Sequence, residues 1–267
     1  MYLRPVFIFL YFVFFITCFF TSCAEKSPED NEPLGEAEIV SLDPKAIDIL
    51  KQMGDFLKSH DAFEFVAEVT NEEVLDSGQK LQFDRLVEVG IRRPNKIMAE
   101  IEDVDGIKKI WYDGDTISML GLKRNLYAKL AVAETIDETL DYLMYEYGID
   151  LPLADFFSNE PFAGMSQFLQ TGRYIGVENL RRRKCHHLAF TQESIDWQIW
   201  IEEGKNAIPR KFVITHINVQ SQPQYSAIFT EWDFSPDLSD LDFEFVPPEG
   251  AHEIEFLALR NEKNKEN

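Results

Sequence analysis

The sequence is poor in basic residues and in cysteine. Its 267 residues include 26 Lys and Arg against 47 Asp and Glu, which gives a formal net charge of -21. A chain with this charge has no electrostatic attraction to a phosphate backbone, so we expect no nucleic-acid partner. The sequence also lacks a Gly-rich turn between a strand and a helix, and it has no repeat of fixed period. We therefore expect neither a parallel nucleotide-binding sheet nor a solenoid.

The N-terminus has the composition of a secretory signal. Arg4 precedes an apolar run over residues 6–20 that is broken only by Thr17. A run of this length fits the hydrophobic region of a signal peptide better than a membrane span, which needs about 20 residues. The sequence therefore predicts a signal peptide over residues 1–22.

The predicted signal peptide ends in a sequence that resembles the lipobox of bacterial lipoproteins. That sequence is Phe20-Thr21-Ser22-Cys23. The resemblance implies that Cys23 is acylated and becomes the new N-terminus, with Cys18 as the alternative acceptor. Ala24, rather than Asp, follows Cys23, which by resemblance to Gram-negative sorting rules favours the outer membrane. We therefore expect an outer-membrane lipoprotein that is attached through its lipid and faces the periplasm or the cell surface.

A solvated linker is expected after the lipobox. Residues 24–40 hold six acidic residues and one Lys, and they include two prolines and no aromatic residue. Such a segment cannot bury apolar surface and stays solvated, so it can act as a flexible tether. We expect the acylated Cys and a flexible acidic linker over residues 23–42, a folded domain over residues 43–257 and a polar tail over residues 258–267. An ordinary secreted protein with a chance cysteine is the alternative.

The folded domain is expected to be stable without a disulfide. Once the signal peptide is removed and Cys23 carries lipid, Cys185 is left without a partner. Apolar residues make up 45% of the chain and aromatic residues 13%, which is enough for a full core at this length. We therefore expect the core alone to stabilise the fold.

Two spacings of apolar residues divide the domain into helices and strands. Over residues 44–60 the spacing of three and four predicts a helix, with Asp43 as N-cap and Pro44 in the first turn. After this helix the spacing becomes two, which predicts antiparallel strands with one apolar face. The expected strands cover residues 63–70, 81–89, 97–101, 107–112, 116–120, 125–129, 173–179, 184–192, 196–203, 209–219 and 224–234.

A second helical region interrupts the strands. The spacing returns to three and four over residues 135–147, and Gly148 supplies a C-terminal stop. A broken helical stretch with Pro161 and Gly164 then continues to about residue 170. The sequence therefore predicts an α+β fold: a single open antiparallel half-barrel of about 10–11 strands, covered on its concave side by helices.

Several motifs resemble known families. Those that resemble the periplasmic lipoprotein carriers of the LolA type are Arg93-Pro94-Asn95-Lys96-Ile97, Tyr112-Asp113-Gly114-Asp115-Thr116 and Asn125-Leu126-Tyr127. The resemblance implies a half-barrel closed by helices, with an apolar cavity that receives acyl chains. Residues 43–257 resemble more closely a family of predicted periplasmic proteins assigned to the same fold, on the strength of Leu151-Pro152-Leu153-Ala154-Asp155, His186-His187-Leu188-Ala189-Phe190, Asp196-Trp197-Gln198-Ile199-Trp200-Ile201 and Pro209-Arg210-Lys211.

The concave face is the candidate binding site. The side chains expected to line it are Phe63, Phe65, Phe83, Val87, Ile97, Ile101, Trp197, Ile199, Phe212 and Ile214. If the helices span the mouth as a lid, an apolar chamber remains for a lipid acyl chain or another apolar small molecule. If the helices fill the concavity, these side chains form an ordinary core.

Arg93 is the remaining candidate ligand-binding residue. In the carriers, the Arg of the Arg-Pro pair lies near the cavity mouth and bonds to the lid, so the resemblance implies this role for Arg93. A guanidinium offers five donors in a fixed fork, which suits lid carbonyls or a lipid ester. The alternative is a strand-end Arg that pairs with a carboxylate.

We expect no catalytic residue, no metal and no cofactor. Cys185 and His187 fall on one face of a strand and His186 on the other, so the three cannot form one site. Three functions remain open: a membrane-tethered binder or carrier of an apolar ligand, a structural or adaptor lipoprotein with an envelope protein partner, and, third, a hydrolase that uses Cys185 and a neighbouring His.

Overall fold

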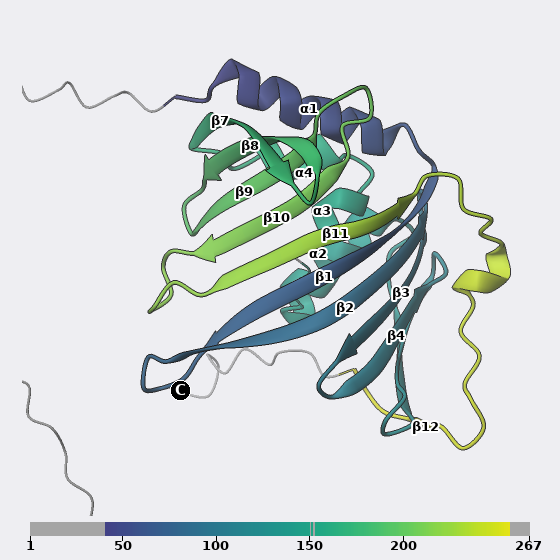
Figure 1. Ribbon diagram of the computed structural model, residues 1–267. Helices are drawn as coiled ribbons and strands as arrows, with labels where there is room; N and C mark the ends of the chain where they lie inside the picture. Colours follow the sequence, from purple (N-terminus) through teal and green to yellow (C-terminus); the bar gives the residue numbers. More distant parts are fainter. Residues whose placement is uncertain (1–40, 150, 152, 257–267) are drawn as a thin grey trace, which may run out of the picture. The chain divides into compact units, whose positions relative to one another are not determined.

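The structure is a computed structural model that describes residues 41–149, 151 and 153–256. In these residues a large curved sheet carries helices on one side (Figure 1). The predicted signal peptide, Cys23 with most of the predicted linker, and the predicted tail over residues 258–267 lie outside the described residues.

Four α-helices and one 3-10 helix occur in the described part of the chain. They are α1 (Pro44–Lys58), α2 (Ile136–Tyr147), α3 (Ala154–Phe157), α4 (Pro161–Ser166) and η1 (Asp240–Phe243). The strands are β1 (Ala62–Val74), β2 (Lys80–Arg92), β3 (Lys96–Asp103), β4 (Gly106–Tyr112), β5 (Thr116–Gly121), β6 (Leu126–Ala131), β7 (Thr171–Leu180), β8 (Arg183–Thr191), β9 (Ile195–Glu202), β10 (Pro209–His216), β11 (Gln224–Asp233) and β12 (His252–Glu253).

All twelve strands belong to one open sheet. Its order is β12-β6-β5-β4-β3-β2-β1-β11-β10-β9-β8-β7, so β1 and β11 join the two series of hairpins. Neighbouring strands are antiparallel, except that β12 runs parallel to β6. The predicted α+β half-barrel is therefore confirmed, and the prediction of 10–11 strands missed β12. With only two residues, β12 shows no alternation of apolar side chains that a sequence pattern could reveal.

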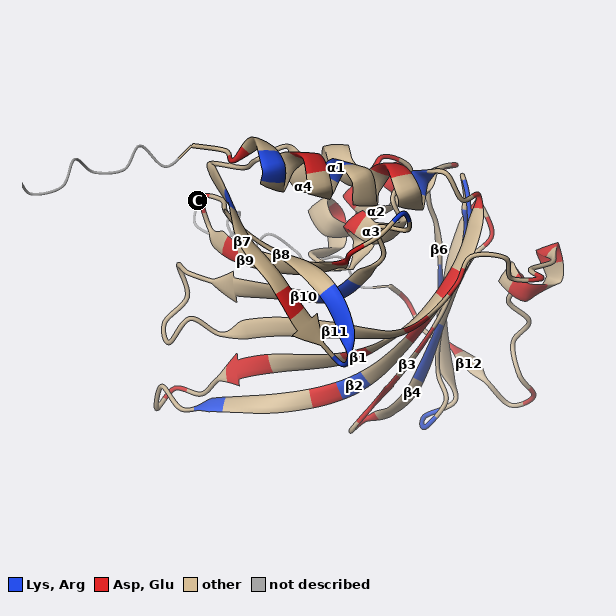
Figure 2. Ribbon diagram, turned by 45° about the horizontal axis from the view of Figure 1, so that its top comes forward, with Lys and Arg blue, Asp and Glu red and all other residues tan. Residues whose placement is uncertain are grey.

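Helix α1 begins and packs as its sequence predicts. The Asp43 side chain accepts a hydrogen bond of 2.8 Å from the backbone N–H of Lys45, and Pro44 occupies the first turn. The buried face of the helix is formed by Ala46, Ile49, Leu50, Met53, Gly54 and Leu57. This face contacts β7, β8 and β9 as well as α3 and α4. Figure 2 shows the four helices lying together inside the curve of the sheet.

Helix α2 is capped at both ends. The Thr135 hydroxyl accepts a hydrogen bond of 3.3 Å from the Glu138 N–H, and Gly148 ends the helix at φ 61°. A left-handed residue of this kind is most often Gly, which confirms the predicted stop. The broken stretch after it forms two short helices, α3 and α4, rather than one long one.

The strand register shows which side chains face the helices, because paired residues point to the same face. On β1–β6 three rows share the concave face. The upper row is Phe63, Ile91, Ile97, Tyr112, Ile117 and Leu130; the middle row is Phe65, Val89, Ala99, Ile110, Met119 and Ala128; the lower row is Ala67, Val87, Ile101, Lys108, Gly121 and Leu126. Across β2–β6, burial decreases from the upper row to the lower row. The helices therefore cover the concave face unevenly.

Residues 234–256, which we call the C-terminal strap, wrap around one edge of the sheet. On the outer face, the Phe245 ring lies 5.0 Å from the Trp111 ring and 5.3 Å from the Tyr127 ring. The strap then pairs with the edge strand β6 through β12. On the inner side, the Phe256 ring lies 5.8 Å from the Tyr147 ring of α2. The strap thus adds a wall at the open end of the half-barrel.

Candidate functional site

A cavity of about 490 Å³ lies where β4–β6 meet the end of the strap. Five of its lining residues belong to the middle and lower rows: Lys108, Met119, Gly121, Leu126 and Ala128. Its other lining residues are Asp105, Ile107, Lys123, Arg124, Tyr127, Ile254, Glu255 and Phe256. The cavity therefore occupies the part of the concave side that α1, α3 and α4 leave uncovered.

The chemistry of the cavity is mixed. Met119 and Ala128 supply apolar surface from the sheet, and Ile254 and Phe256 supply it from the strap. Charged side chains stand at the hairpin turns beside it. Binding sites for small molecules are typically apolar hollows of about 300–1,000 Å³ with a few polar groups, so this cavity has a suitable size and composition. It can bury an apolar group while its charged border remains in water.

Six of the ten side chains expected to line a chamber lie inside the core. Phe63, Phe65, Trp197, Ile199, Phe212 and Ile214 are each at most 8% exposed. The Phe156 ring of α3 lies 5.3 Å from the Phe212 ring and 5.0 Å from the Phe229 ring. Under α1 and α3 the concave face is therefore filled by helix side chains.

The other four side chains are partly exposed. Phe83, Val87, Ile97 and Ile101 are half-buried, and Val87 and Ile101 stand in the lower row next to Lys108 of the cavity. The structure thus divides the predicted site into a filled part and an accessible part. None of the ten side chains, nor Arg93, lines the 490 Å³ cavity.

The residues that do line this cavity were not predicted from the sequence. Met119, Leu126 and Ala128 lie on strands whose alternation was recognised, so their common face could have been found from the pattern. Ile254 and Phe256 follow a two-residue strand and carry no periodic signal. Their position depends on the path of the strap, which no local pattern reveals.

Arg93 joins the sheet to two helices. Its Nη1 donates to the carbonyl of Leu57 at 3.1 Å and to that of His60 at 2.8 Å, where α1 ends. Its Nε and Nη2 donate to the carbonyl of Ser158, which follows α3, at 3.1 and 2.8 Å. Burial lowers the pKa of Arg93, and nearby carboxylates, including Asp137, oppose this shift. The guanidinium therefore donates its hydrogen bonds to carbonyls at the ends of helices.

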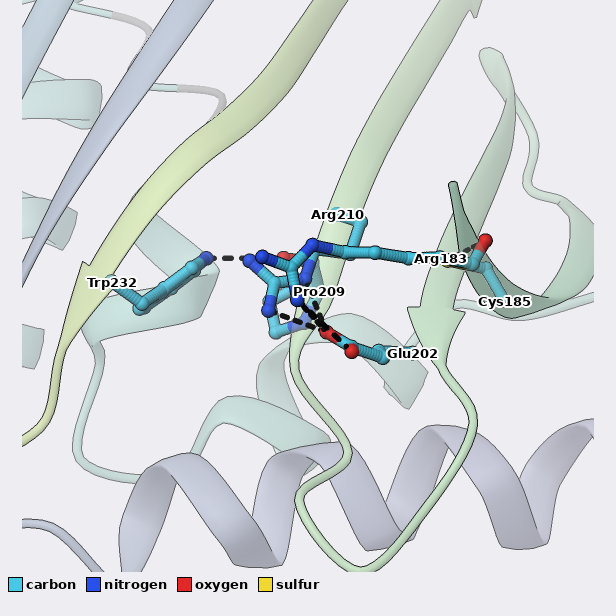
Figure 3. A network of polar contacts seen from close by, with 6 residues as sticks. All are labelled: Arg183, Cys185, Glu202, Pro209, Arg210 and Trp232. Carbon is cyan, nitrogen blue, oxygen red and sulfur yellow. Dashed lines mark hydrogen bonds and ion pairs between the residues drawn. The ribbon is translucent and has the colours of Figure 1, made fainter. Parts of the chain in front are cut away.

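Cys185 lacks the properties of a nucleophile. Its side chain is fully buried, and burial raises the pKa of the thiol to about 11. Figure 3 shows Cys185 beside a polar network in which Glu202 accepts hydrogen bonds from Arg183 and Arg210. Since the thiolate is the reactive form of cysteine, this thiol is poorly suited to attack a substrate.

The two adjacent histidines point to opposite faces. His187 shares the outer face with Cys185, where its Nδ1 lies 2.9 Å from Glu178 and its ring stacks on Trp200 at 4.1 Å. His186 lies on the other face and contacts the Tyr174 hydroxyl at 3.2 Å. Within residues 41–149, 151 and 153–256, no group of three His, Cys, Asp or Glu side chains is placed to hold a metal ion.

No helix in the described part of the chain combines the length and the apolar character needed to cross a membrane.

Comparison with protein families gives one assignment. The family model described as "Predicted periplasmic protein (DUF2092)" matches residues 46–257. No curated protein matches the chain.

Several solved structures are similar to this chain at low sequence identity. A conserved protein from Thermus thermophilus has 10% identity and a TM-score of 0.45, and the match covers 79% of this chain and 99% of that chain. The lipoprotein LppX of Mycobacterium tuberculosis has 12% identity and a TM-score of 0.43, with coverage of 74% and 100%. A LolA superfamily protein from Nitrosomonas europaea has 10% identity and a TM-score of 0.34, and the match covers 75% of this chain and 97% of that chain.

Proposed function

Since the chain belongs to the family of predicted periplasmic proteins (DUF2092), we propose that it is a non-catalytic envelope protein that binds an acyl chain or another apolar ligand on its concave side. The observation that carries this proposal is the cavity of about 490 Å³ beside β4–β6. Met119, Ala128 and Phe256 give it apolar walls. Burial of an apolar chain against such walls is favourable by about 25 cal/mol per Å² of surface removed from water.

The half-buried side chains of the lower row extend this binding surface. Val87 and Ile101 continue the row from Lys108 toward β1, on the side away from the strap. An acyl chain longer than the cavity would follow this row across the sheet. The predicted ligand-binding residues Phe83 and Ile97 belong to the same face and would contact the same chain.

The helical cover is the proposed lid, and Arg93 is the proposed restraint on it. Three carbonyls at the ends of α1 and α3 accept hydrogen bonds from its guanidinium. The cover consists of separate short helices after α2, which can shift as units when a ligand enters. In this proposal Arg93 positions the lid and does not contact the ligand in the closed state.

The proposed location is the outer membrane. Acylation of Cys23 would attach the protein to the membrane through lipid, and the acidic linker would hold the half-barrel away from the surface. The domain would then face either the periplasm or the cell surface.

A cavity-filling substitution tests the binding site. Gly121 lines the cavity, and a Cβ added to it would meet only the Leu126 carbonyl, at 3.9 Å. Gly121→Leu should therefore fill the cavity without strain. We expect it to weaken binding of the neutral probe 1-N-phenylnaphthylamine at least tenfold, measured by fluorescence titration of the mature chain carrying Cys23→Ser.

Ala131→Leu is the matched control. Ala131 is exposed on β6, three residues from the cavity residue Ala128, and it does not line the cavity. This variant should bind the probe as the wild type does. If Gly121→Leu and the wild type bind the probe with equal affinity, and both variants are folded, the cavity is not the binding site.

An adaptor function is the second candidate. It is favoured by the filled core under α1 and α3, where Phe156 packs on Phe212 and Phe229. In this case the sheet surface would bind an envelope protein partner. Crosslinking in cells should then give one dominant partner, and the Gly121→Leu variant should retain it.

A hydrolase is the least favoured function. The buried thiol of Cys185 and the opposite directions of His186 and His187 argue against it. Loss of a measured turnover when Cys185 is replaced by Ala would revive this possibility.

A further inference from the structure

Basic side chains gather at the end of the sheet where the cavity lies. Arg85, Lys108, Lys123 and Arg124 form what we call the basic rim. Lys108, Lys123 and Arg124 line the cavity directly. The rim is unusual in a chain with 47 acidic and only 26 basic residues.

Register and contacts bring the members of the rim together. On β2, Arg85 lies two residues from Val87 of the lower row, toward the turn that joins β1 and β2. It pairs with the buried Val69. Lys108 belongs to the lower row itself. Lys123 lies against the β3–β4 turn, because a Cβ on Gly106 would meet the Lys123 Cβ at 3.2 Å.

Part of this positive charge is not neutralised within the protein. Lys108 forms an ion pair with Asp103 at 2.7 Å. The hydrogen bond from Lys108 is the main cause that lowers the pKa of Asp103. The positive charge of Arg85 lowers it further. In the described residues, Lys123 and Arg124 are exposed and make no ion pair or hydrogen bond. They are available to a charge outside the chain.

Arg85 carries an unused donor. Its Nε is buried and has no hydrogen-bond partner. A buried polar group without a partner is destabilising, so native structures usually supply one. Along β2, Arg85 stands between the half-buried Phe83 and Val87, so this member of the rim borders the apolar lower row.

On the basis of the proposed function, we propose that the ligand is an amphiphile with an anionic head group, either carboxylate or phosphate. Its chain occupies the apolar cavity, and its head group lies at the basic rim on Lys123 and Arg124. Asp105 and Glu255 also border the cavity, and they oppose a second negative charge. A carboxylate, which carries one charge, should therefore bind better than a phosphate monoester, which carries about 1.5 to 2 charges at pH 7.

Displacement of 1-N-phenylnaphthylamine by four competitors tests this inference. The competitors share a 16-carbon chain: hexadecanoate, palmitoyl-lysophosphatidic acid, hexadecanol and monopalmitoylglycerol. At low salt, the two anionic competitors should bind at least tenfold more tightly than the two neutral ones. The difference should shrink in 0.5 M salt, because charge attraction at an exposed rim is screened. The better of the two anionic competitors identifies carboxylate or phosphate as the preferred head.

Substitutions assign this difference to the rim. In the double variant Lys123→Gln and Arg124→Gln, the anionic competitors should lose about tenfold in affinity and the neutral ones should be unchanged. The control Arg182→Gln and Lys205→Gln removes the same charge from exposed turns that do not line the cavity, and it should bind all four as the wild type does.

The outcomes separate the inference from the proposed function. Equal affinity of the wild type for anionic and neutral competitors, or unchanged discrimination in the rim variant, would overturn the anionic head group and leave the apolar cavity in place. Failure of the wild type to bind the probe and all four competitors would overturn both.

Discussion

Arg93 donates two hydrogen bonds, from Nε at 3.1 Å and from Nη2 at 2.8 Å, to the single carbonyl of Ser158. The same guanidinium also reaches the carbonyls of Leu57 and His60. One side chain from the turn between β2 and β3 thus holds the ends of α1 and α3, which cover the concave face. Any movement of this cover must break hydrogen bonds to a charged donor.

Replacement of Arg93 should loosen the cover. In Arg93→Leu three carbonyls lose the hydrogen bonds of the guanidinium, and we expect the free energy of unfolding in urea to fall by about 3 kcal/mol. Hydrogen exchange should increase at the C-terminal ends of α1 and α3, and the amount of bound lipid should change. Arg93→Lys keeps the charge without the fork and should be intermediate. Wild-type lipid content together with wild-type exchange in Arg93→Leu would contradict the role in gating.

Asp43 should contribute measurably to stability. Its side chain caps α1 through Lys45 N–H and also accepts a hydrogen bond of 3.2 Å from the N–H of Tyr174 on β7. Asp43→Ala should therefore lower the free energy of unfolding by about 1–2 kcal/mol. Asp43→Asn, which retains a capping oxygen, should lose much less. If both variants unfold at the wild-type urea concentration, the cap has no energetic role.

Cys185 should make stability depend on pH in alkaline solution. Burial raises the pKa of its thiol from 9.0 to about 11, so the unfolded chain loses this proton first. The contribution to stability is complete below about pH 9 and is lost as the pH rises toward 11. At about 1.4 kcal/mol per pKa unit, it amounts to about 3 kcal/mol at most. The difference in unfolding free energy between wild type and Cys185→Ala should therefore decrease between pH 8.5 and 11, and a constant difference would contradict this assignment.

Cys23 should be the site of lipid attachment. The residue lies outside the described residues, so this expectation rests on the lipobox resemblance alone. Cells grown with labelled palmitate should incorporate label into the wild-type protein, which should partition into the membrane fraction. Cys23→Ser should abolish both, whereas Cys18→Ser should change neither. Labelling of the Cys23→Ser protein would assign the anchor elsewhere.

Most of the fold could be predicted from local sequence patterns. The spacing of Leu50, Met53 and Leu57 gave the buried face of α1, and the alternation along β1–β11 matched the strands closely. The exceptions are elements without a periodic signal. β12 has two residues, and its parallel pairing with β6 depends on the path of the whole strap.

The candidate site was harder to predict than the fold. Alternation identifies the face on which Phe65 and Phe212 lie, but it does not tell which part of that face a helix covers. Both side chains are buried, since Phe156 of α3 and other helix residues fill the space above them. The open part is set by where α2 and the strap end, which is a tertiary property. Arg93 was singled out by a motif rather than by a spacing; its hydrogen bonds to helix-end carbonyls are seen in the structure, and its role in ligand binding stays a prediction.

The central claim is that the concave side holds an apolar ligand. Native mass spectrometry of the chain carrying Cys23→Ser, purified from its own envelope without detergent, tests this claim most directly. We expect a fraction of the protein to carry a noncovalent adduct of several hundred daltons that is released on denaturation and is reduced in Gly121→Leu. A protein that shows only its bare mass, and that remains bare after incubation with hexadecanoate or hexadecanol, would contradict the account.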